Sequence, residues 1–205
     1  MDRQSWALTL EDGGKITGTR FGSGRRVVIL LHGRNFDQAS WHDVAEELAQ
    51  AGCTAITVDF RGYGLSSPLP QGASHAQDVV WAIDALRADG AEEVALLGGS
   101  MGGAAALRAA ALLGGRVDRL AALSPAIGAE EVARQLPPVP TLLLASRDEP
   151  YVDLTKFQEM CPHQLTVHLY PGDAHNQELL RGPYGSDVRE RLRDFLAEGL
   201  SQRTM

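Results

Sequence analysis

The segment that most constrains the fold of this chain is a strand, a tight turn and a helix centred on Ser100. An apolar run over residues 94–97 leads into a Gly-Gly-Ser-Met-Gly turn, and an alanine-rich stretch over 101–113 follows at once. In this strand–turn–helix context the G-x-S-x-G pattern holds a serine on a sharp turn with its hydroxyl exposed. We expect a strained backbone at Ser100, and glycines at 98 and 102 because only a hydrogen side chain fits there. Ser100 is therefore the candidate nucleophile.

Several other short apolar runs predict a mostly parallel sheet. Continuous apolar runs suit strands that are buried on both faces, and glycines follow the ends of three helical stretches between them. The expected strands are 27–31, 54–58, 94–97, 120–123, 141–145 and 165–170, and the expected helices are 41–51, 73–89, 101–113, 129–136 and 186–200. Strands that alternate with helices predict right-handed β-α-β units in a twisted sheet with helices on both faces.

The N-terminal part differs, because residues 5–11 and 15–21 alternate apolar and polar side chains around Asp12-Gly13-Gly14. This pattern predicts an antiparallel hairpin that extends the sheet. The chain has 205 residues without an internal repeat or linker. We therefore expect one domain over residues 1–205.

Charge and composition argue against several classes of partner. The formal net charge is −7 and the sequence has no basic block, which disfavours nucleic acid and anionic membrane surfaces. No run approaches the roughly 18 apolar residues of a membrane span, and the first residues lack the apolar part of a secretory signal. Cys53 and Cys161 lie far apart without a metal or redox spacing, so we expect buried free thiols. These features predict a cytoplasmic protein.

Residues that carry chemistry follow three of the expected strands. In open α/β sheets, functional groups gather beyond the carboxyl ends of the strands. Ser100 follows the run 94–97, Asp148 follows the run 141–145, and His175 follows the last run. Glu149 and Asp153 are neighbouring alternatives for the acid. The order Ser…Asp…His is the one expected for the α/β-hydrolase triad.

Five segments in this order resemble the α/β-hydrolase family, and the resemblance covers essentially the whole chain. The matching pieces are Leu30-Leu31-His32-Gly33, Asp59-Phe60-Arg61-Gly62-Tyr63-Gly64-Leu65-Ser66, Gly98 to Gly103, Ser146-Arg147-Asp148 and Gly172-Asp173-Ala174-His175. The resemblance implies a single-domain α/β-hydrolase fold. Many larger relatives carry a helical cap, but the connection from 125 to 140 has room for little more than a short helix. No cap domain is expected, and the serine should lie in a shallow, open cleft.

The resemblance also implies roles for individual residues. Ser100 would attack a carbonyl, His175 would take its proton, and Asp148 would orient the imidazole and stabilise its charged form. The backbone N–H groups of Arg34 and Met101 would form the oxyanion hole. No cofactor and no metal are implied.

A phosphate-binding loop and structural roles are the alternatives for these residues. The turn at Ser100 lacks the lysine and the glycine spacing of a phosphate-binding loop. Asp59 resembles part of a structural turn of the family, His32 is expected to organise the oxyanion loop, and Asp173 is expected to be a turn residue. The remaining histidines, which are expected to have structural roles, are His42, His75, His163 and His168.

The sequence therefore predicts a cofactor-independent serine hydrolase that cleaves a small-molecule carboxylic ester or thioester through an acyl-serine. Two alternatives remain open: an acyltransferase or perhydrolase that uses the same acyl-enzyme, and a hydrolase-like binding protein with slow or vestigial catalysis. The sequence does not assign an oligomeric state. By loop position, the residues expected to line the cleft are Asn35, Phe36, Phe60, Tyr63, Pro125, Tyr151 and Asn176.

Overall fold

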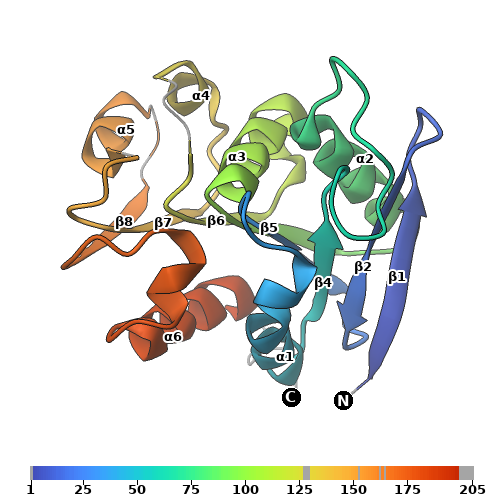
Figure 1. Cartoon of the computed structure of the whole chain (residues 1–205), viewed down its shortest axis with the longest axis horizontal. Helices are drawn as coiled ribbons and strands as arrows, with labels where there is room; N and C mark the ends of the chain where they lie inside the picture. Colours follow the sequence, from blue (N-terminus) through green and yellow to red (C-terminus); the bar gives the residue numbers. More distant parts are fainter. Residues whose placement is uncertain (1, 127–129, 152, 162, 164, 199–205) are drawn as a thin grey trace.

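An eight-stranded sheet with the order β1-β2-β4-β3-β5-β6-β7-β8 forms the centre of the molecule (Figure 1). The computed structural model of the chain describes residues 2–126, 130–151, 153–161, 163 and 165–198. The strands are β1 (Arg3–Thr9), β2 (Lys15–Phe21), β3 (Arg26–Leu31), β4 (Thr54–Asp59), β5 (Glu93–Gly99), β6 (Arg119–Leu123), β7 (Thr141–Ser146) and β8 (Thr166–Tyr170). β2 pairs antiparallel with both β1 and β4, whereas all other neighbours are parallel. The expected sheet with an N-terminal hairpin is confirmed.

The first strand begins and ends two residues earlier than the alternating pattern suggested. The turn takes up Leu10, whose N–H donates to the Gly14 carbonyl at 2.7 Å and whose carbonyl accepts from the Gly13 N–H at 2.9 Å. Two backbone hydrogen bonds thus close the turn, and Leu10 is buried beneath it.

Helices cover both faces of the sheet, as Figure 1 shows. One face carries α2 (His75–Ala88), α3 (Met101–Leu113), α4 (Glu130–Gln135) and α5 (Leu154–Met160), and the other carries α1 (His42–Gln50) and α6 (Gly185–Ala197). Short 3-10 turns are η1 (Gln38–Trp41), η2 (Gly114–Arg116) and η3 (Asn176–Leu180). Two expected helix ends, Ala129 and Leu200, lie outside the described residues. Apart from these ends, the expected helices are present, and α5 is an additional one.

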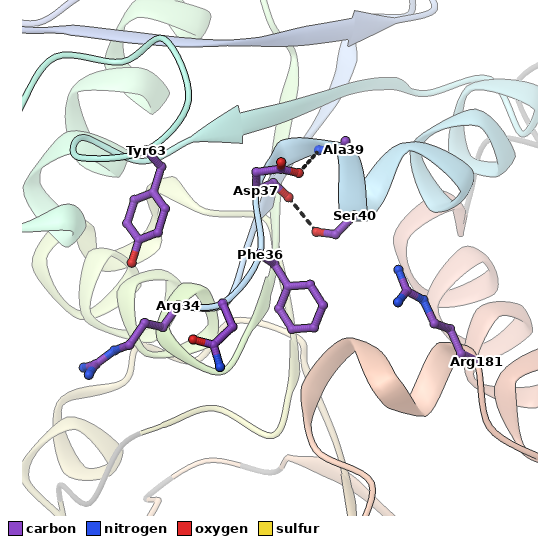
Figure 2. Close-up of a pocket in the computed structure, with 8 residues that line it drawn as sticks. Arg34, Phe36, Asp37, Ala39, Ser40, Tyr63 and Arg181 are labelled. Atoms are coloured by element: carbon purple, nitrogen blue, oxygen red, sulfur yellow. Dashed lines mark hydrogen bonds between the residues drawn. The ribbon is translucent and has the colours of Figure 1, made fainter.

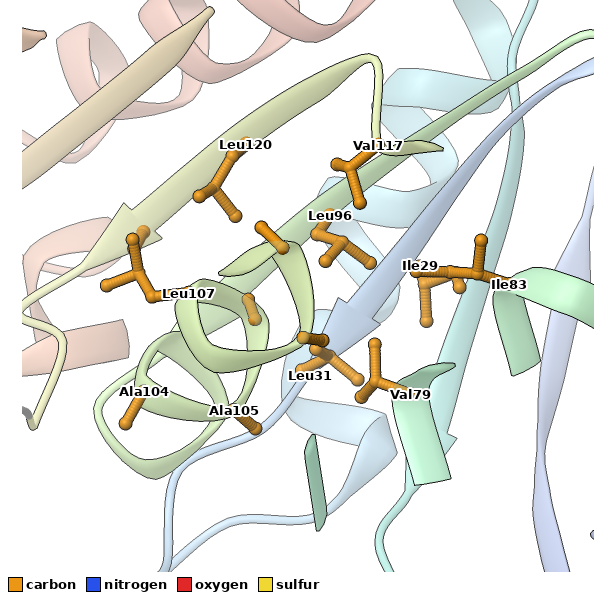
Figure 3. Packing of buried hydrophobic residues seen from close by; sticks show 14 of the residues in the cluster. Ile29, Leu31, Val79, Ile83, Leu96, Ala104, Ala105, Leu107, Val117 and Leu120 are labelled. Atoms are coloured by element: carbon orange, nitrogen blue, oxygen red, sulfur yellow. The ribbon is translucent and has the colours of Figure 1, made fainter. Parts of the chain in front are cut away.

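The close packing of α3 against the sheet comes from its alanines. Ala106, Ala109 and Ala110 are completely buried in the same apolar cluster as Leu31 and Leu96 of the sheet. Figure 3 shows α3 beside these strands, with Ala104 and Ala105 on the side of the helix away from Leu96. Small side chains let the helix axis approach the strands, because there is little volume to fit between them. The helix therefore starts directly above the carboxyl ends of β3 and β5, where the candidate nucleophile lies.

Neither cysteine forms a disulfide bond, which agrees with the expectation of free thiols. Cys53 and Cys161 are both buried, and burial raises the pKa of the Cys53 thiol to about 11. A thiol with such a pKa is protonated and a poor nucleophile near neutral pH. No helix among the described residues is long and apolar enough to cross a membrane.

A buried ion network fixes the segment that follows β4. Arg61 is 1% exposed; its Nε donates to Asp78 Oδ2 at 2.9 Å and its Nη1 to Asp12 Oδ2 at 2.6 Å. A further hydrogen bond joins Arg61 Nη2 to Asp78 Oδ1, and the guanidinium lies over the Trp81 ring. The arginine therefore ties the β1–β2 turn to the first turn of α2.

We expect Arg61→Leu to lower the free energy of unfolding by about 3–5 kcal/mol, because Asp78 would remain buried without a counter-charge. Arg61→Leu combined with Asp78→Leu should cost less than Arg61→Leu alone, since no buried charge is then left unpaired at that point. Urea unfolding followed by circular dichroism measures both values. Strictly additive losses would contradict this account of the network.

Candidate active site

The turn between β5 and α3 holds Ser100 in the strained conformation expected from the sequence. Ser100 has φ 49° and ψ −112°, a region that residues with a side chain rarely adopt. A Cβ at Gly98 would lie 2.3 Å from the Gly102 carbonyl oxygen, and a Cβ at Gly102 would lie 2.2 Å from that of Leu31. The backbone passes so close to its neighbours that both positions require glycine. The turn is further held by the Ser100 N–H, which donates to the Leu123 carbonyl at 2.9 Å.

Ser100 and His175 lie within hydrogen-bond distance although they are 75 residues apart. The distance from Ser100 Oγ to His175 Nε2 is 2.9 Å, and both side chains are partly buried. The ring of Tyr151 packs against the imidazole in an edge-on arrangement with a centroid separation of 4.8 Å. The structure therefore brings together the serine and histidine that the sequence singled out.

The acid beside the imidazole is Glu149, which corrects the expectation of Asp148. His175 Nδ1 is hydrogen-bonded to Glu149 Oε2, and the Glu149 side chain is completely buried. Asp148 is exposed and has no contact with His175 among the described residues. An ionised carboxylate only accepts hydrogen bonds, so Nδ1 carries the proton and Nε2 is free to accept from the Ser100 hydroxyl.

The reason for this one-residue difference lies in the backbone beyond β7. The N–H of Arg147 donates to the Tyr170 carbonyl at 2.8 Å, and that of Asp148 donates to the Gly172 carbonyl at 3.0 Å. These bonds keep the segment beside the end of β8, and they leave Asp148 pointing outward and Glu149 inward. Sequence alone does not determine which of two adjacent carboxylates faces the histidine.

Arg34 and Met101, whose backbone amides are expected in the oxyanion hole, line the same cavity as Ser100. Met101 is the first residue of α3, so its N–H has no acceptor within the helix, and the helix dipole adds partial positive charge there. Arg34 lies in the turn after β3. The preceding amide, of Gly33, is already used, since it donates to Gln177 Oε1 at 3.4 Å. The Arg34 N–H therefore remains the candidate donor from this turn.

His32 is a structural residue of the loop that carries Arg34. Its ring is completely buried, and its Nε2 accepts from the Phe60 N–H at 3.2 Å, so Nδ1 bears the proton that is donated to the Gly33 carbonyl at 2.8 Å. Burial lowers the pKa of His32, and the bond to Gly33 only partly offsets this effect. Protonation of Nε2 would break the bond from Phe60, so the loop requires neutral His32.

Sequence reasoning placed Asn176 in the cleft but missed what its side chain does there. Asn176 is buried with φ 58°, and its N–H donates to Ser124 Oγ at 3.1 Å. A Cβ at Gly33 would lie 2.2 Å from Asn176 Nδ2, and a Cβ at Gly99 would lie 1.7 Å from Asn176 Oδ1. The carboxamide fills the space between the ends of β3 and β5. Asn176 therefore sets the spacing of the two loops that meet at the cavity.

The cavity at Ser100 has a volume of about 470 Å³ and opens to solvent. Its lining residues are Arg34, Asn35, Phe36, Ser100, Met101, Ala126, Tyr151, His175 and Asn176. Of the expected lining residues, Phe60 is buried beneath His32, Pro125 packs against Gly103, and Tyr63 borders a neighbouring cavity instead. Among the described residues, α4 is the only helix between β6 and β7, so no separate subdomain covers the serine. The absence of a cap domain from this part of the chain agrees with the sequence analysis.

The neighbouring cavity, of about 640 Å³, lies along the loop that follows β3 (Figure 2). In that view Arg34 and Arg181 lie on opposite sides of Phe36. Asp37 caps the 3-10 turn η1, since its Oδ1 accepts from the Ala39 N–H at 2.9 Å. The Phe36 ring thus borders both this cavity and the one at Ser100.

The other candidate acids lie away from the imidazole. Asp59 accepts from the backbone and side-chain amides of Gln38, at 2.9 and 3.1 Å, which supports its structural role. Asp173 is exposed in the turn after β8. Asp153 caps α5 by accepting from the Lys156 N–H at 3.0 Å.

Comparisons with known proteins agree with this arrangement. Residues 26–139 match the family described as alpha/beta hydrolase fold, and the chain belongs to that family. The chain is 30% identical to a 2-hydroxy-6-oxononadienedioate/2-hydroxy-6-oxononatrienedioate hydrolase of Dechloromonas aromatica, over 85% of this chain and 61% of that protein. It is 32% identical to the dihydrolipoyllysine-residue acetyltransferase component of an acetoin cleaving system of Cupriavidus necator, over 56% of this chain and 30% of that protein. The chain thus spans less than two thirds of the length of either curated relative.

Solved structures show the same fold at low sequence identity. An esterase of Pyrococcus furiosus superposes with a TM-score of 0.81 at 19% identity, over 95% of this chain and 92% of the esterase. A thioesterase domain from the curacin biosynthetic pathway gives a TM-score of 0.75 at 16% identity, over 96% and 99% of the two chains.

We expect His32 to titrate below the ordinary histidine pKa of about 6.5, because its folded environment disfavours the charged ring. A lowered folded pKa means that the unfolded chain binds the proton more readily, so this contribution to stability is present above pH ~6.5 and is lost as the pH falls. Titration of the histidine ring carbons by NMR, with assignment through a His32→Asn variant, measures the value. A midpoint at or above 6.5 would contradict the buried, neutral ring.

We expect Glu149→Gln to slow the reaction of Ser100 with a fluorophosphonate by roughly 10³–10⁴-fold, since the amide would favour the wrong imidazole tautomer and carries no charge. Asp148→Asn, which removes an exposed carboxylate at the adjacent position, should change the rate less than about twofold. Stopped-flow measurement of the adduct gives both rates. The reverse ranking of the two variants would return the acid role to Asp148.

Proposed function

We propose that the chain is a cofactor-independent serine hydrolase that cleaves carboxylic esters or thioesters with Ser100, His175 and Glu149. The observation that carries the proposal is the continuous hydrogen-bonded series from Glu149 through His175 to Ser100. A plain binding protein has no need for this series, for the strained serine and for the two glycines that make room for it.

In the first step the Ser100 oxygen attacks the substrate carbonyl carbon while its proton passes to His175 Nε2. The buried Glu149 carboxylate stabilises the imidazolium that forms, and the Met101 and Arg34 amides stabilise the negative charge on the carbonyl oxygen. The bond from the carbonyl carbon to the alcohol oxygen or thiol sulfur then breaks. The leaving group takes the proton from His175, and the acyl group remains on Ser100.

In the second step water attacks the acyl carbon and His175 takes a proton from it. The bond to Ser100 breaks, the serine oxygen regains the proton, and the acid product leaves. An alcohol, thiol or peroxide could replace water in the same step, which would give acyl transfer or perhydrolysis.

The shape of the site favours small or flexible substrates. The cavity at Ser100 is open, and the Tyr151 ring packs edge-on against the imidazole. Because a shallow cavity cannot enclose a large apolar ligand, the recognised part is a short acyl chain or one end of a longer molecule.

The direct test is reaction with a fluorophosphonate, followed by peptide mass spectrometry and product analysis. An adduct on Ser100 and release of free acid from small esters are the expected results. No adduct would favour a binding protein. Preferential formation of a new ester, thioester or peracid when alcohols, thiols or peroxide are added would favour the transferase or perhydrolase alternative.

We expect Ser100→Ala and His175→Ala each to lower kcat on the order of 10⁴-fold or more, because each removes the same proton-coupled attack. The double variant should lose little beyond either single one. Initial rates with a small ester measure the three variants. Mild losses that multiply in the double variant would mean that the two residues act independently and would contradict the mechanism.

A further inference from the structure

A third cavity, of about 220 Å³, lies beside the cavity at Ser100 and shares three lining residues with it. The shared residues are Arg34, Met101 and Ala126, and the cavity continues from them to the start of α2 and along α3. A substrate bound at Ser100 can therefore extend past Met101 into this third cavity. The catalytic mechanism proposed above makes no use of it.

One face of α3 forms the floor of this cavity. Met101, Ala104, Ala105 and Arg108 all line it, and a spacing of three or four residues places them on the same side of a helix. The two alanines are too small to fill the space, whereas Arg108 closes its far end. Seven residues separate Met101 from Arg108, about 10 Å along the helix axis, and helical side chains incline toward the N-terminus. Arg108 therefore lies about two helical turns from Met101, on the same face of α3.

The charge of the cavity is positive, although the whole chain carries a net charge of −7. Its lining contains Arg34 and Arg108 but no aspartate or glutamate. Neither arginine has a carboxylate partner in the described part of the chain. Several other arginines are paired with carboxylates, as Arg87 is with Asp118 and Arg189 with Glu47. Two guanidinium groups without carboxylate partners that line one small cavity are chemically suited to bind an anion.

The cavity along the loop after β3 is less suited to an anion, even though Arg34 and Arg181 both border it. The Asp37 carboxylate lines it as well and opposes a bound negative charge. The acid-free cavity on α3 is therefore the better match for a charged group.

We propose that the third cavity binds a carboxylate or phosphate carried by the ester or thioester substrate, with Arg108 as the specificity-determining residue and Arg34 as its partner. This inference rests on the proposed function, because the anion is recognised as part of a molecule whose carbonyl lies at Ser100. A guanidinium offers a planar pair of donors that either anion can accept from. The protein would thus prefer acidic substrates over neutral ones of the same size.

The experiment compares matched substrates that differ in charge alone. Monomethyl esters of the dicarboxylic acids from succinic to suberic acid are paired with their neutral carboxamides. S-acetyl-4′-phosphopantetheine, which carries a phosphate on the leaving group, is paired with neutral S-acetylpantetheine. The selectivity is the ratio of kcat/KM for the acidic substrate to that for the neutral one. The first series reports a carboxylate on the acyl group and the second a phosphate on the leaving group.

We expect the wild type to prefer the acidic member of at least one series by tenfold or more, and Arg108→Gln to lower that preference by about tenfold. Arg108→Lys should restore part of it. Arg20→Gln is the matched control, since it removes one positive charge from a cavity at the opposite end of the strands and should leave the preference unchanged. Equal selectivity in the wild type and Arg108→Gln would overturn the proposal. Equal losses of selectivity in Arg20→Gln and Arg108→Gln would also overturn it, because the preference would then follow from the net charge of the protein.

A binding measurement separates this proposal from the proposed function. Calorimetry with Ser100→Ala compares binding of the same acid and carboxamide pairs with and without Arg108→Gln. If the wild type hydrolyses no ester but Arg108→Gln weakens binding of the acidic member to Ser100→Ala, the proposed function fails and the anion site stands. If esters are hydrolysed and Arg108 affects neither selectivity nor binding, the anion site fails and the proposed function stands.

Discussion

The close approach of the first turn of α3 to strands β3 and β5 is the constraint on which the site depends. Because Gly98 and Gly102 leave no room for side chains, the chain must turn from strand to helix within one residue, and Ser100 takes a positive φ. That conformation directs the hydroxyl toward His175, and the same turn places the free Met101 amide beside it. The proposed nucleophile and the proposed oxyanion donor are thus positioned by backbone packing, which does not depend on flexible side chains.

Much of the fold could be predicted from the sequence because its signals are local. Apolar runs marked the parallel strands, and the glycine-serine turn marked the start of α3 at its observed residue. Ser100 and His175 followed from their places after β5 and after β8. The acid could not be chosen correctly, because Asp148 and Glu149 are chemically alike and adjacent. Backbone hydrogen bonds from the end of β7 to the end of β8 turn Glu149 inward, and these contacts appear only in the folded chain.

Two further features had only weak signals in the sequence. α5 is seven residues long and buries Leu154 and Phe157 alone, which is too short for a clear helical period, although Asp153 is a good N-cap. The packing of Asn176 is a long-range contact between η3 and the ends of β3 and β5. Its traces in the sequence are Gly33 and Gly99, and the turn at Ser100 does not itself explain Gly99. When a motif does not explain one of its glycines, that glycine indicates that a neighbouring side chain occupies the space.

The helix that begins at the proposed nucleophile also carries the proposed anion site, and this would link catalysis to substrate choice. Ala104 and Ala105 line the third cavity together with Arg108, on one face of α3, whereas Gly102 lies against the end of β3. α4 is the only helix between β6 and β7 in the described part of the chain. With no cap domain there, recognition of the proposed substrate would come from side chains on the scaffold itself. At an open surface, recognition by charge is more effective than recognition by shape. Two guanidinium groups attract an anion there, whereas an apolar group would gain little from burial. An open hydrolase site can therefore still discriminate, provided that its charged groups are held on a rigid element such as α3.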